Sequence, residues 1–353
     1  MGCFLRNTWY VAAWAKDVTR ALMPRTLLDE PVLLFRKQDG TIAALADTCP
    51  HRFAPLHMGK LIGDTVECGY HGLCFDTAGY CVANPHGNHV IPAAARIAAY
   101  PVIERHSLVW IWMGEVERAD AGLVPDFGYL TDPLRRTVGG SMTMAAHYEI
   151  LADNLLDPSH ARFLHSKHLE NDGEATLKTT QEGEVIYAKT WLPDRKIPNF
   201  FAGCLPSDPE KIDMWIEFTW RAPGLMYNST GVTFAGCPRS EGVENIGTHL
   251  LTPETECSTH YFHGSSRNYR LGDPKADERI LQWFHDGFVL EDKVMTEAIQ
   301  RRMKGATDIL KLNPVLLPID AAPVRARRQL AQLIEAEAGK AKVPAERACN
   351  PGI

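Results

Sequence analysis

The sequence predicts an α+β protein in which a β-rich first domain precedes a larger domain that combines an antiparallel sheet with long helices. Three observations support this fold class. Short apolar runs separated by turn residues fill the first 120 residues, and further strand-like runs follow between residues 175 and 265. A helical spacing of apolar residues then extends from about Ala276 to Met303. The chain has 353 residues, which is enough for two domains with sizeable cores.

The first domain is predicted from its strands and turns. Runs rich in aromatic and β-branched residues occupy Trp9–Ala13, Pro31–Arg36 and Leu108–Met113. Asp39-Gly40 follows the second run and indicates a tight hairpin. The polar stretch Glu115–Pro125 carries no strong pattern, so we place the boundary there and predict domains at 1–120 and 121–353.

Composition and charge exclude several classes of function. Hydrophobic residues make up 45% and charged residues 23% of the chain, and the formal net charge is −6. No basic face is evident, so we expect no nucleic-acid partner. No apolar stretch reaches the roughly 18 residues that a membrane span needs, and the N-terminus lacks the layout of a signal peptide. The nine cysteines are an odd number in a long chain, which disfavours a secreted disulfide framework and favours a cytoplasmic protein.

Two cysteine–histidine pairs form the first metal-type motif. Cys49 and His51 make a C-x-H pair, and after sixteen residues Cys68 and His71 make a C-x-x-H pair. This is the ligand pattern of a Rieske [2Fe–2S] centre, in which two histidines replace two cysteines on one iron. The alternative is a structural Cys₂His₂ zinc site. Zinc pairs, however, usually place cysteine with cysteine and histidine with histidine.

The second motif is Asn154–His165, with the sequence NLLDPSHARFLH. Histidines within an apolar run are costly unless something pairs with them, and two histidines plus a carboxylate are typical of non-haem Fe(II) oxygenases. The alternative is a helix whose histidines cap or hydrogen-bond locally. His160 and His165 lie about 140° apart around an ideal helix, so both can bind one ion only if the backbone changes after His160 or before His165. His168 is a rival ligand.

The second domain is predicted to contain an antiparallel sheet. Its clearest strands are Val185–Trp191, Met214–Trp220, Thr248–Thr252 and Thr259–His263. Gly231–Gly247 is rich in glycine and polar residues, and we interpret it as a mobile connection. Polar side chains on or beside these strands could line a cavity or could be satisfied structural groups, namely Asn228, His249, His260 and His263.

A long helix over about Ala276–Met303 could supply the missing carboxylate. An i, i+4, i+7 spacing places one set of residues on a single face, namely Leu281, Phe288, Asp292, Met295 and Ile299. An aspartate within an apolar stripe needs a partner. Periodicity alone does not choose between Asp292 and its neighbour Glu291. A last amphipathic helix is predicted at Val324–Ala338.

Together these motifs resemble the oxygenase component of Rieske non-haem iron oxygenases. The similarity is greatest to the aromatic O-demethylase branch, which includes vanillate O-demethylase and dicamba monooxygenase. It covers nearly the whole chain and includes the strings RNTWYVAAW, CPHRFAPL, NPHGN, GTHLLTPETE and LEDKV. The resemblance implies an N-terminal Rieske [2Fe–2S] domain and a helix-grip (START-like) catalytic domain, in which an antiparallel sheet surrounds a long helix.

The resemblance also implies roles for individual residues. The cluster ligands would be Cys49, His51, Cys68 and His71. The ligands of a mononuclear Fe(II) would be His160, His165 and Asp292. Asp157 matches an aspartate that, in a ring of three chains, links a cluster histidine of one subunit to an iron histidine of the next, so we expect a homotrimer. Asn154 matches a residue near the iron, and Asn228 and His249 align with polar substrate contacts of the dicamba enzyme.

The activity that the resemblance implies is O-demethylation of a methoxylated aromatic acid, with phenol and formaldehyde as products. O₂ would be the oxidant, and electrons from NAD(P)H would arrive through a separate reductase or ferredoxin, because the chain has no flavin or dinucleotide fingerprint. The alternatives are hydroxylation of an aryl methyl group, as in toluenesulfonate oxidation, and arene cis-dihydroxylation. A non-catalytic Rieske electron carrier with a ligand-binding domain is an alternative from another class.

Overall fold

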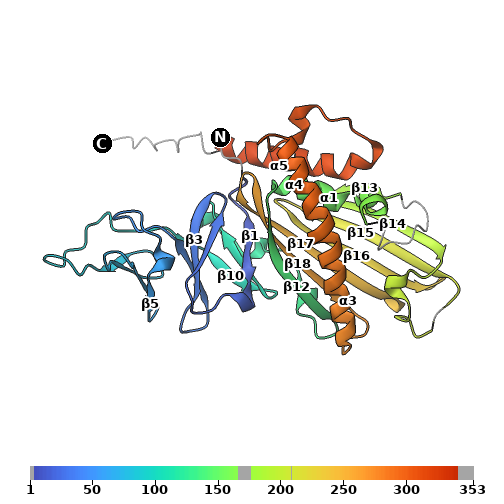
Figure 1. The fold of residues 1–353 in the computed structure, drawn as a ribbon, viewed down its shortest axis with the longest axis horizontal. Helices are drawn as coiled ribbons and strands as arrows, with labels where there is room; N and C mark the ends of the chain where they lie inside the picture. The colour runs from blue at the N-terminus through green and yellow to red at the C-terminus, as the bar shows by residue number, and fades with distance from the viewer. Residues whose placement is uncertain (1–3, 166–175, 208, 341–353) are drawn as a thin grey trace, which may run out of the picture.

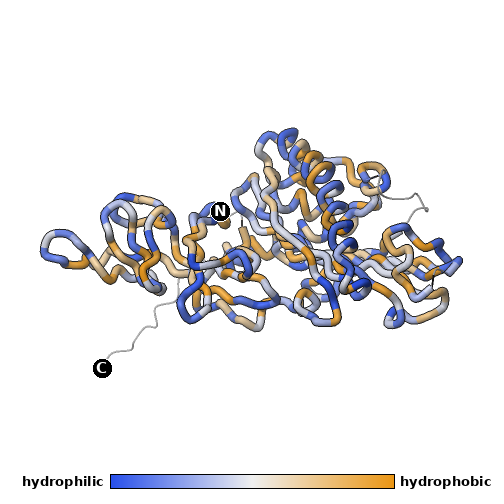
Figure 2. The backbone as a smooth tube through the Cα atoms, turned by 60° about the horizontal axis from the view of Figure 1, so that its bottom comes forward, coloured by the Kyte–Doolittle hydropathy of each residue, from blue (hydrophilic) through white to orange (hydrophobic). Residues whose placement is uncertain are grey.

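The computed structural model describes residues 4–165, 176–207 and 209–340, so the predicted rival ligand His168 lies outside the described residues. Figure 1 shows an elongated molecule with a small β-rich lobe at one end and a large sheet crossed by helices at the other. The predicted α+β class is confirmed. Figure 2 shows hydrophilic residues gathered at outer loops, including the loop at the tip of the small lobe.

The N-terminal part contains three small antiparallel sheets. Their strand orders are β1-β11-β10, β2-β3-β4-β9 and β5-β6-β7-β8. The strands are β1 (Trp9–Trp14), β2 (Met23–Leu27), β3 (Glu30–Arg36), β4 (Ile42–Ala46), β5 (Lys60–Ile62), β6 (Thr65–Glu67), β7 (Cys74–Phe75), β8 (Cys81–Ala83), β9 (Ala99–Tyr100), β10 (Val102–Arg105) and β11 (Leu108–Trp112). The three strands predicted from sequence in this part are therefore confirmed.

The predicted hairpin joins β3 to β4, where Arg36 pairs with Ile42. The amide of Lys37 donates to the carbonyl of Thr41 at 2.7 Å and closes the turn. Gly40 has φ +86°, which a residue with a Cβ rarely adopts. The Asp-Gly signal in the sequence thus reports a real conformational requirement.

The C-terminal part is built on one seven-stranded antiparallel sheet with the order β12-β18-β17-β16-β15-β14-β13. Its strands are β12 (Arg136–Met144), β13 (Lys178–Glu182), β14 (Val185–Arg195), β15 (Ile212–Arg221), β16 (Leu225–Phe234), β17 (Val243–Thr255) and β18 (Ser258–Arg267). All four strands predicted here are confirmed. β12, β13 and β16 were not among them.

The connection predicted at Gly231–Gly247 is shorter than predicted, since only residues 235–242 join the two strands. β16 continues to Phe234 and β17 begins at Val243, so most of that segment is strand. A Cβ on Gly231 would lie 2.1 Å from Cζ2 of the Trp215 indole. Glycine stands there because the indole packs flat over the strand, not because the chain turns.

The two faces of this sheet have different neighbours because side chains alternate along each strand. Leu225, Leu250 and Phe262 pack against the N-terminal part, including Trp9 and Trp110. The residues next to them in sequence, Met226, His249 and Tyr261, project to the opposite face. There the ring of Phe288 lies 5.6 Å from the ring of His249, measured between centroids. One face thus joins the two parts, and the other faces a helix.

The helices of the C-terminal part cover the free face and one edge of the sheet (Figure 1). They are α1 (Tyr148–Leu156), α2 (Ala161–Leu164), α3 (Pro274–Phe284), α4 (Lys293–Arg302) and α5 (Ala321–Lys340). A π-helical segment, η9 (His285–Asp292), joins α3 to α4 without a break. Short 3₁₀ turns are η1 (Ala15–Asp17), η2 (Leu56–Met58), η3 (Val116–Arg118), η4 (Ala121–Leu123), η5 (Gly128–Leu130), η6 (Pro158–His160), η7 (Asn199–Phe201), η8 (Arg239–Glu241), η10 (Ile309–Leu312) and η11 (Pro318–Asp320).

The long helix predicted over about Ala276–Met303 is confirmed as α3–η9–α4, but only Phe288 and Asp292 of its predicted apolar face are buried. Leu281 and Met295 are each 46% exposed. The buried residues instead recur about every four positions, namely Ala276, Ile280, Phe288, Asp292, Thr296 and Gln300. The π-helical turn is wider than an α-helical turn, so a 3.6-residue period extrapolated across it misplaces the stripe.

The predicted domain boundary near residue 120 falls between β11, which pairs with β1, and β12, which joins the large sheet. Its exact position stays a prediction. Across the described residues, no helix combines the length and the apolar composition needed to cross a membrane.

A buried ion cluster holds α5, which includes the predicted helix Val324–Ala338, onto α1. The Arg327 side chain is 4% exposed, and its Nε lies 2.9 Å from Oδ1 of Asp153. A second guanidinium nitrogen lies 3.2 Å from Oε2 of Glu149. Buried charges of this kind are stable only while each has its partner.

We therefore predict that Arg327→Met lowers the free energy of unfolding by about 3 kcal/mol, because it leaves two half-buried carboxylates unpaired. Urea unfolding followed by circular dichroism measures the loss. Arg328→Met on the same helix is the control, because Arg328 is exposed and its removal should change stability by less than about 0.5 kcal/mol. Equal losses in the two variants would contradict the prediction.

Candidate metal centre

The Asn154–His165 motif is a broken helix. α1 ends at Leu156, and Pro158 begins the 3₁₀ turn η6, with the carboxylate of Asp157 accepting the amide N–H of Ser159 at 2.9 Å. The backbone returns to the α conformation in α2 after His160, and His165 follows as its last cap. The required change of backbone lies at His165, whose φ of −101° and ψ of 24° fall outside the α-helical conformation. It brings the ring centroids of His160 and His165 to 5.2 Å.

Asp292 completes a compact group with these two histidines. Its Oδ1 lies 3.5 Å from Nε2 of His160 and 3.4 Å from Nε2 of His165. The side chain of Asp292 is 4% exposed and sits at the end of the π-helical segment. The three donor atoms all lie within 4.8 Å of one another. Within the described parts of the chain, this is the one set of three or more residues that could jointly hold a single metal ion.

The other ring nitrogen of each histidine has its own partner. Nδ1 of His160 lies 2.5 Å from the backbone carbonyl of Asp157, and Nδ1 of His165 lies 2.6 Å from Oε2 of Glu291. Both partners are acceptors, so both Nδ1 atoms carry the proton. Both Nε2 lone pairs then point at the space beside Asp292. Glu291 and Asp292, which sequence left as competing ligands, thus contact opposite sides of the same imidazole.

Asn154 lies against the same group. Its amide nitrogen donates to Oδ1 of Asp292 at 3.1 Å and lies 3.4 Å from Nε2 of His160. This contact connects α1 to the π-helical segment. It supports a role for Asn154 in holding the carboxylate in place.

These three residues fit a small divalent metal. Ligand bonds of about 2.1 Å at right angles place neighbouring donor atoms about 3 Å apart, close to the separations found here. Two neutral imidazoles and one carboxylate leave coordination positions open for other ligands, as non-haem Fe(II) sites require. The assignment of these residues as iron ligands stays a prediction, which this geometry supports.

The two cysteine–histidine loops have the same backbone pattern. The amide of Cys49 donates to the carbonyl of Ala54, and the amide of Phe53 donates to the carbonyl of Cys49, each at 2.9 Å. Cys68 makes the same two bonds, with Leu73 at 2.8 Å and Gly72 at 2.9 Å. Two equivalent turns thus present one cysteine and one histidine each.

The four side chains of these loops form two pairs. The thiols of Cys49 and Cys68 are buried and in contact with each other, whereas the rings of His51 and His71 approach at 4.6 Å between centroids near the surface. They do not converge on one point in the way that His160, His165 and Asp292 do. A Cys₂His₂ zinc ion would need that convergence. Two separate pairs fit a two-iron cluster with cysteines on one iron and histidines on the other.

The predicted substrate residues Asn228 and His249 lie side by side on the sheet face that the π-helical segment covers. Nε2 of His249 lies 2.8 Å from Oδ1 of Asn228. Burial lowers the pKa of His249 to about 4, so its ring is neutral at physiological pH. His263 stacks on the ring of Phe284 at 3.5 Å and lines the same face, whereas His260 bonds to the backbone carbonyl of Thr26 and belongs to the packing.

Aromatic side chains of α3 and η9 face the polar residues Asn228 and His249. The rings of Phe284 and Phe288 stack at 4.3 Å, and Trp283 packs edge-on against Phe288 at 5.5 Å. Phe288 is also one turn before Asp292. Three groups therefore meet between β16, β17 and η9. They are the candidate metal ligands, the polar pair Asn228 and His249, and the aromatic wall of Trp283, Phe284 and Phe288.

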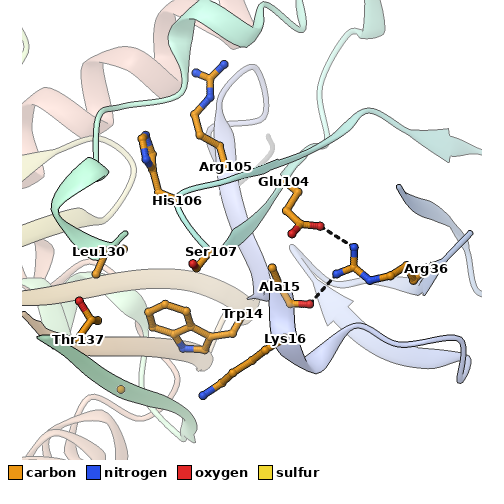
Figure 3. A pocket seen from close by; sticks show the side chains of 11 residues that line it. Trp14, Ala15, Lys16, Arg36, Glu104, Arg105, His106, Ser107, Leu130 and Thr137 are labelled. Atoms are coloured by element: carbon orange, nitrogen blue, oxygen red, sulfur yellow. Dashed lines mark hydrogen bonds and ion pairs between the residues drawn. The ribbon is translucent and has the colours of Figure 1, made fainter. Parts of the chain in front are cut away.

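A surface cavity of about 540 Å³ lies elsewhere, between β1, β12 and the β10–β11 turn (Figure 3). Its two arginines and its glutamate already have partners. Arg36 bonds to Oε2 of Glu104 at 2.7 Å and to the carbonyl of Ala15 at 2.7 Å, and Arg105 bonds to the carbonyl of Ala121 at 3.0 Å. None of the predicted site residues lines it, so it is not the candidate site.

The sequence analysis considered Glu291 only as a metal ligand and did not predict its contact with His165. We predict that Glu291→Leu weakens iron binding about 10- to 100-fold, because the hydrogen bond that orients His165 is lost. Glu291→Gln keeps an acceptor and should bind iron more tightly than Glu291→Leu. Anaerobic chelator competition measures the affinity, and the visible spectrum of the cluster serves as an internal check.

Glu278→Leu is the matched control, because Glu278 is exposed on α3, which is continuous with the η9 segment that carries Glu291. It should leave iron affinity unchanged. If Glu291→Leu bound iron as tightly as this control, the orienting role of Glu291 would be excluded.

Two sequence families match the chain. Residues 8–101 match the Rieske [2Fe-2S] domain, and residues 144–336 match the vanillate O-demethylase oxygenase C-terminal domain. The first match contains both cysteine–histidine loops. The second contains the broken helix, the large sheet and the π-helical segment.

Individual proteins are similar over almost the full length. The oxygenase component of dicamba O-demethylase from Stenotrophomonas maltophilia is 41% identical, with 95% of this chain and 99% of the relative covered. The oxygenase component of chloroacetanilide N-alkylformylase from Rhizorhabdus wittichii is 39% identical, with 97% and 99% covered. The crystal structure of dicamba monooxygenase with non-heme iron and dicamba superposes with a TM-score of 0.84 at 39% identity, covering 96% of this chain and 99% of that one.

Sequence, fold and the two groups of donor residues therefore agree. The chain belongs to the Rieske non-haem iron oxygenases, as an oxygenase component whose cofactors are a Rieske [2Fe–2S] cluster and a mononuclear non-haem iron.

Proposed function

We propose that this enzyme O-demethylates a methoxylated aromatic acid. The observation that carries the proposal is the meeting of three features at one place. The group His160, His165 and Asp292 lies beside an aromatic wall, and the polar pair Asn228 and His249 faces the same wall. An aromatic acid needs these same features, namely an apolar contact for its ring and hydrogen-bond partners for its acid group. The similarity to the dicamba and vanillate enzymes points to the same substrate class.

The reaction balances with one O₂ and two electrons. One oxygen atom enters a C–H bond of the methoxy group, and the other leaves as water with two protons. The resulting hemiacetal breaks its C–O bond to give phenol and formaldehyde. When bound, the cluster supplies electrons one at a time and the iron supplies the site where O₂ is activated. NAD(P)H, through a separate reductase or ferredoxin, is the proposed electron source.

The residues of the chain position the reactants. Asn228, oriented by His249, would hold the acid group, and Phe284 and Phe288 would pack along the ring. Asn154 keeps Asp292 in place through its 3.1 Å bond. The benefit is proximity, because the methoxy carbon then lies next to the metal group in a protected setting.

We also propose that the working unit is a homotrimer. The cluster loops flank the small β5–β8 sheet at one end of the molecule, whereas η9 crosses the sheet of the other part (Figure 1). Within one chain, Asp157 contacts His160 through its backbone carbonyl, and its Oδ1 caps η6. Among the described residues no other group is hydrogen-bonded to this carboxylate, and we propose that a second chain contacts it. A hydrogen bond from His71 of a neighbouring subunit to Asp157 would couple the two metal centres.

The first experiment uses purified enzyme with cluster and iron, a surrogate reductase, NADH and a panel of methoxybenzoates. We expect formaldehyde and phenol in a one-to-one ratio with NADH consumed for at least one acid. The panel also includes toluene-4-sulfonate and a chloroacetanilide, because the relatives include a subunit of a toluene-4-sulfonate monooxygenase system and a chloroacetanilide N-alkylformylase. NADH consumption without formaldehyde from any methoxybenzoate, together with an oxidised product from another member, would replace O-demethylation by that reaction.

A second prediction concerns Asp157. Asp157→Asn keeps the acceptor that caps η6, so we expect folding and both metal contents to be retained. Turnover should fall by more than about ten-fold, because a charge-assisted hydrogen bond between subunits is lost. Metal analysis and formaldehyde production measure the two effects on the same sample. Undiminished turnover in Asp157→Asn would remove this residue from the electron path.

A further inference from the structure

The substrate-facing pair Asn228 and His249 is part of a longer chain of hydrogen bonds. On the far side of the imidazole, Nδ1 of His249 lies 2.5 Å from the hydroxyl of Tyr261. The three residues come from β16, β17 and β18, which are neighbours in the sheet. All three side chains project to the face that η9 covers. The order Tyr261–His249–Asn228 thus runs across the sheet.

The direction of these bonds follows from what each group can donate. Within the described residues, the hydroxyl of Tyr261 has no other hydrogen-bond partner than Nδ1 of His249. If the imidazole donated from Nδ1, the buried O–H of Tyr261 would be left without an acceptor, which is costly. The O–H of Tyr261 therefore donates to Nδ1. Burial raises the pKa of Tyr261 well above its usual range, which keeps that proton in place.

The proton of the neutral His249 ring then resides on Nε2, which donates to Oδ1 of Asn228. This bond fixes the orientation of the Asn228 amide. Its NH₂ group is left facing away from His249, and its nearest partner is the hydroxyl of Thr230 at 3.4 Å. The row thus ends in donor N–H groups.

Gly247 makes room for this arrangement. It lies opposite Asn228 in the β16–β17 register. A Cβ at position 247 would lie 2.2 Å from Oδ1 of Asn228 and 3.1 Å from Nε2 of His249. The atoms that it would meet are side-chain atoms of the row, not backbone. A larger residue at 247 would therefore disturb the row specifically.

We propose that Tyr261 is a positioning residue that acts through His249 to fix the amide of Asn228 as a hydrogen-bond donor, so that this face selects aromatic substrates with an anionic acceptor group, a carboxylate or a sulfonate. The groups that would donate to the substrate here are neutral. In the described chain, no lysine or arginine is hydrogen-bonded to Tyr261, His249 or Asn228. The substrate class rests on the proposed function, but the donor row can be tested by binding alone.

The test is anaerobic calorimetric titration of the enzyme carrying cluster and iron. The ligands are 2-, 3- and 4-methoxybenzoate, and each is compared with the methoxytoluene of the same ring pattern, which lacks the acid group. We expect Tyr261→Phe to weaken binding of the preferred acid about ten-fold, as for loss of one buried hydrogen bond, and to leave the methoxytoluene unchanged. Gly247→Ala should show the same selective loss, which provides a second route if Tyr261→Phe folds poorly.

Tyr129→Phe is the matched control. The hydroxyl of Tyr129 is also bonded to β17, at 2.8 Å from Oγ1 of Thr248, but on the other face of the sheet. It should leave binding of both ligand types unchanged. Unchanged acid binding in both Tyr261→Phe and Gly247→Ala, or equal weakening for acid and methoxytoluene, would overturn the proposal. So would a wild-type enzyme without preference for the acid. Acid-selective binding without formaldehyde release would instead reject the proposed reaction and leave the donor row standing.

Discussion

The buried carboxylate of Asp292 is the constraint on which the catalytic half of the molecule depends. It lies almost out of contact with water, 3.4–3.5 Å from two imidazole nitrogens that also face inward. Burial of such groups without a partner is costly, so the elements that carry them must be placed to satisfy one another. α1 ends at Leu156, the α conformation ends again before His165, and the long helix widens over η9, which carries Asp292. The helices thus depart from regular geometry at the places that carry the candidate metal ligands.

The same reasoning explains how the sheet is used. Its inner face packs against the N-terminal part through residues such as Leu225 and Phe262, which fixes the sheet as a rigid platform. The alternate residues are therefore available on the other face, and three of them form the donor row of Tyr261, His249 and Asn228. A platform held from behind can present polar groups in front at fixed spacing. The helix that covers this row also carries the carboxylate of Asp292. The proposed substrate contacts and the candidate metal ligands therefore meet at the same interface between helix and sheet.

The cluster loops show a different solution to the same problem of precision. Their geometry is set by backbone hydrogen bonds, repeated at Cys49 and Cys68, and depends little on the side chains between. Thiols are buried beneath the loops while the imidazoles of His51 and His71 remain near the surface. A centre that must pass electrons to another site benefits from ligands at its outer edge. This arrangement agrees with the proposed contact between subunits.

The sequence alone determined the features that depend on local chemistry. The spacing of Cys49, His51, Cys68 and His71 predicted a two-iron centre, the angular separation of His160 and His165 required a change of backbone between them, and Asp39-Gly40 predicted its hairpin. Only the tertiary structure decided the features that depend on distant neighbours. Gly231 looked like part of a loop, but it is a strand residue under the indole of Trp215. The stripe through Leu281 and Met295 failed because a π-helical turn, held by packing, shifts the period. The choice between Glu291 and Asp292, and the link from Tyr261 to His249, depend on which side chains meet across the fold, and periodicity within one segment carries no information about that.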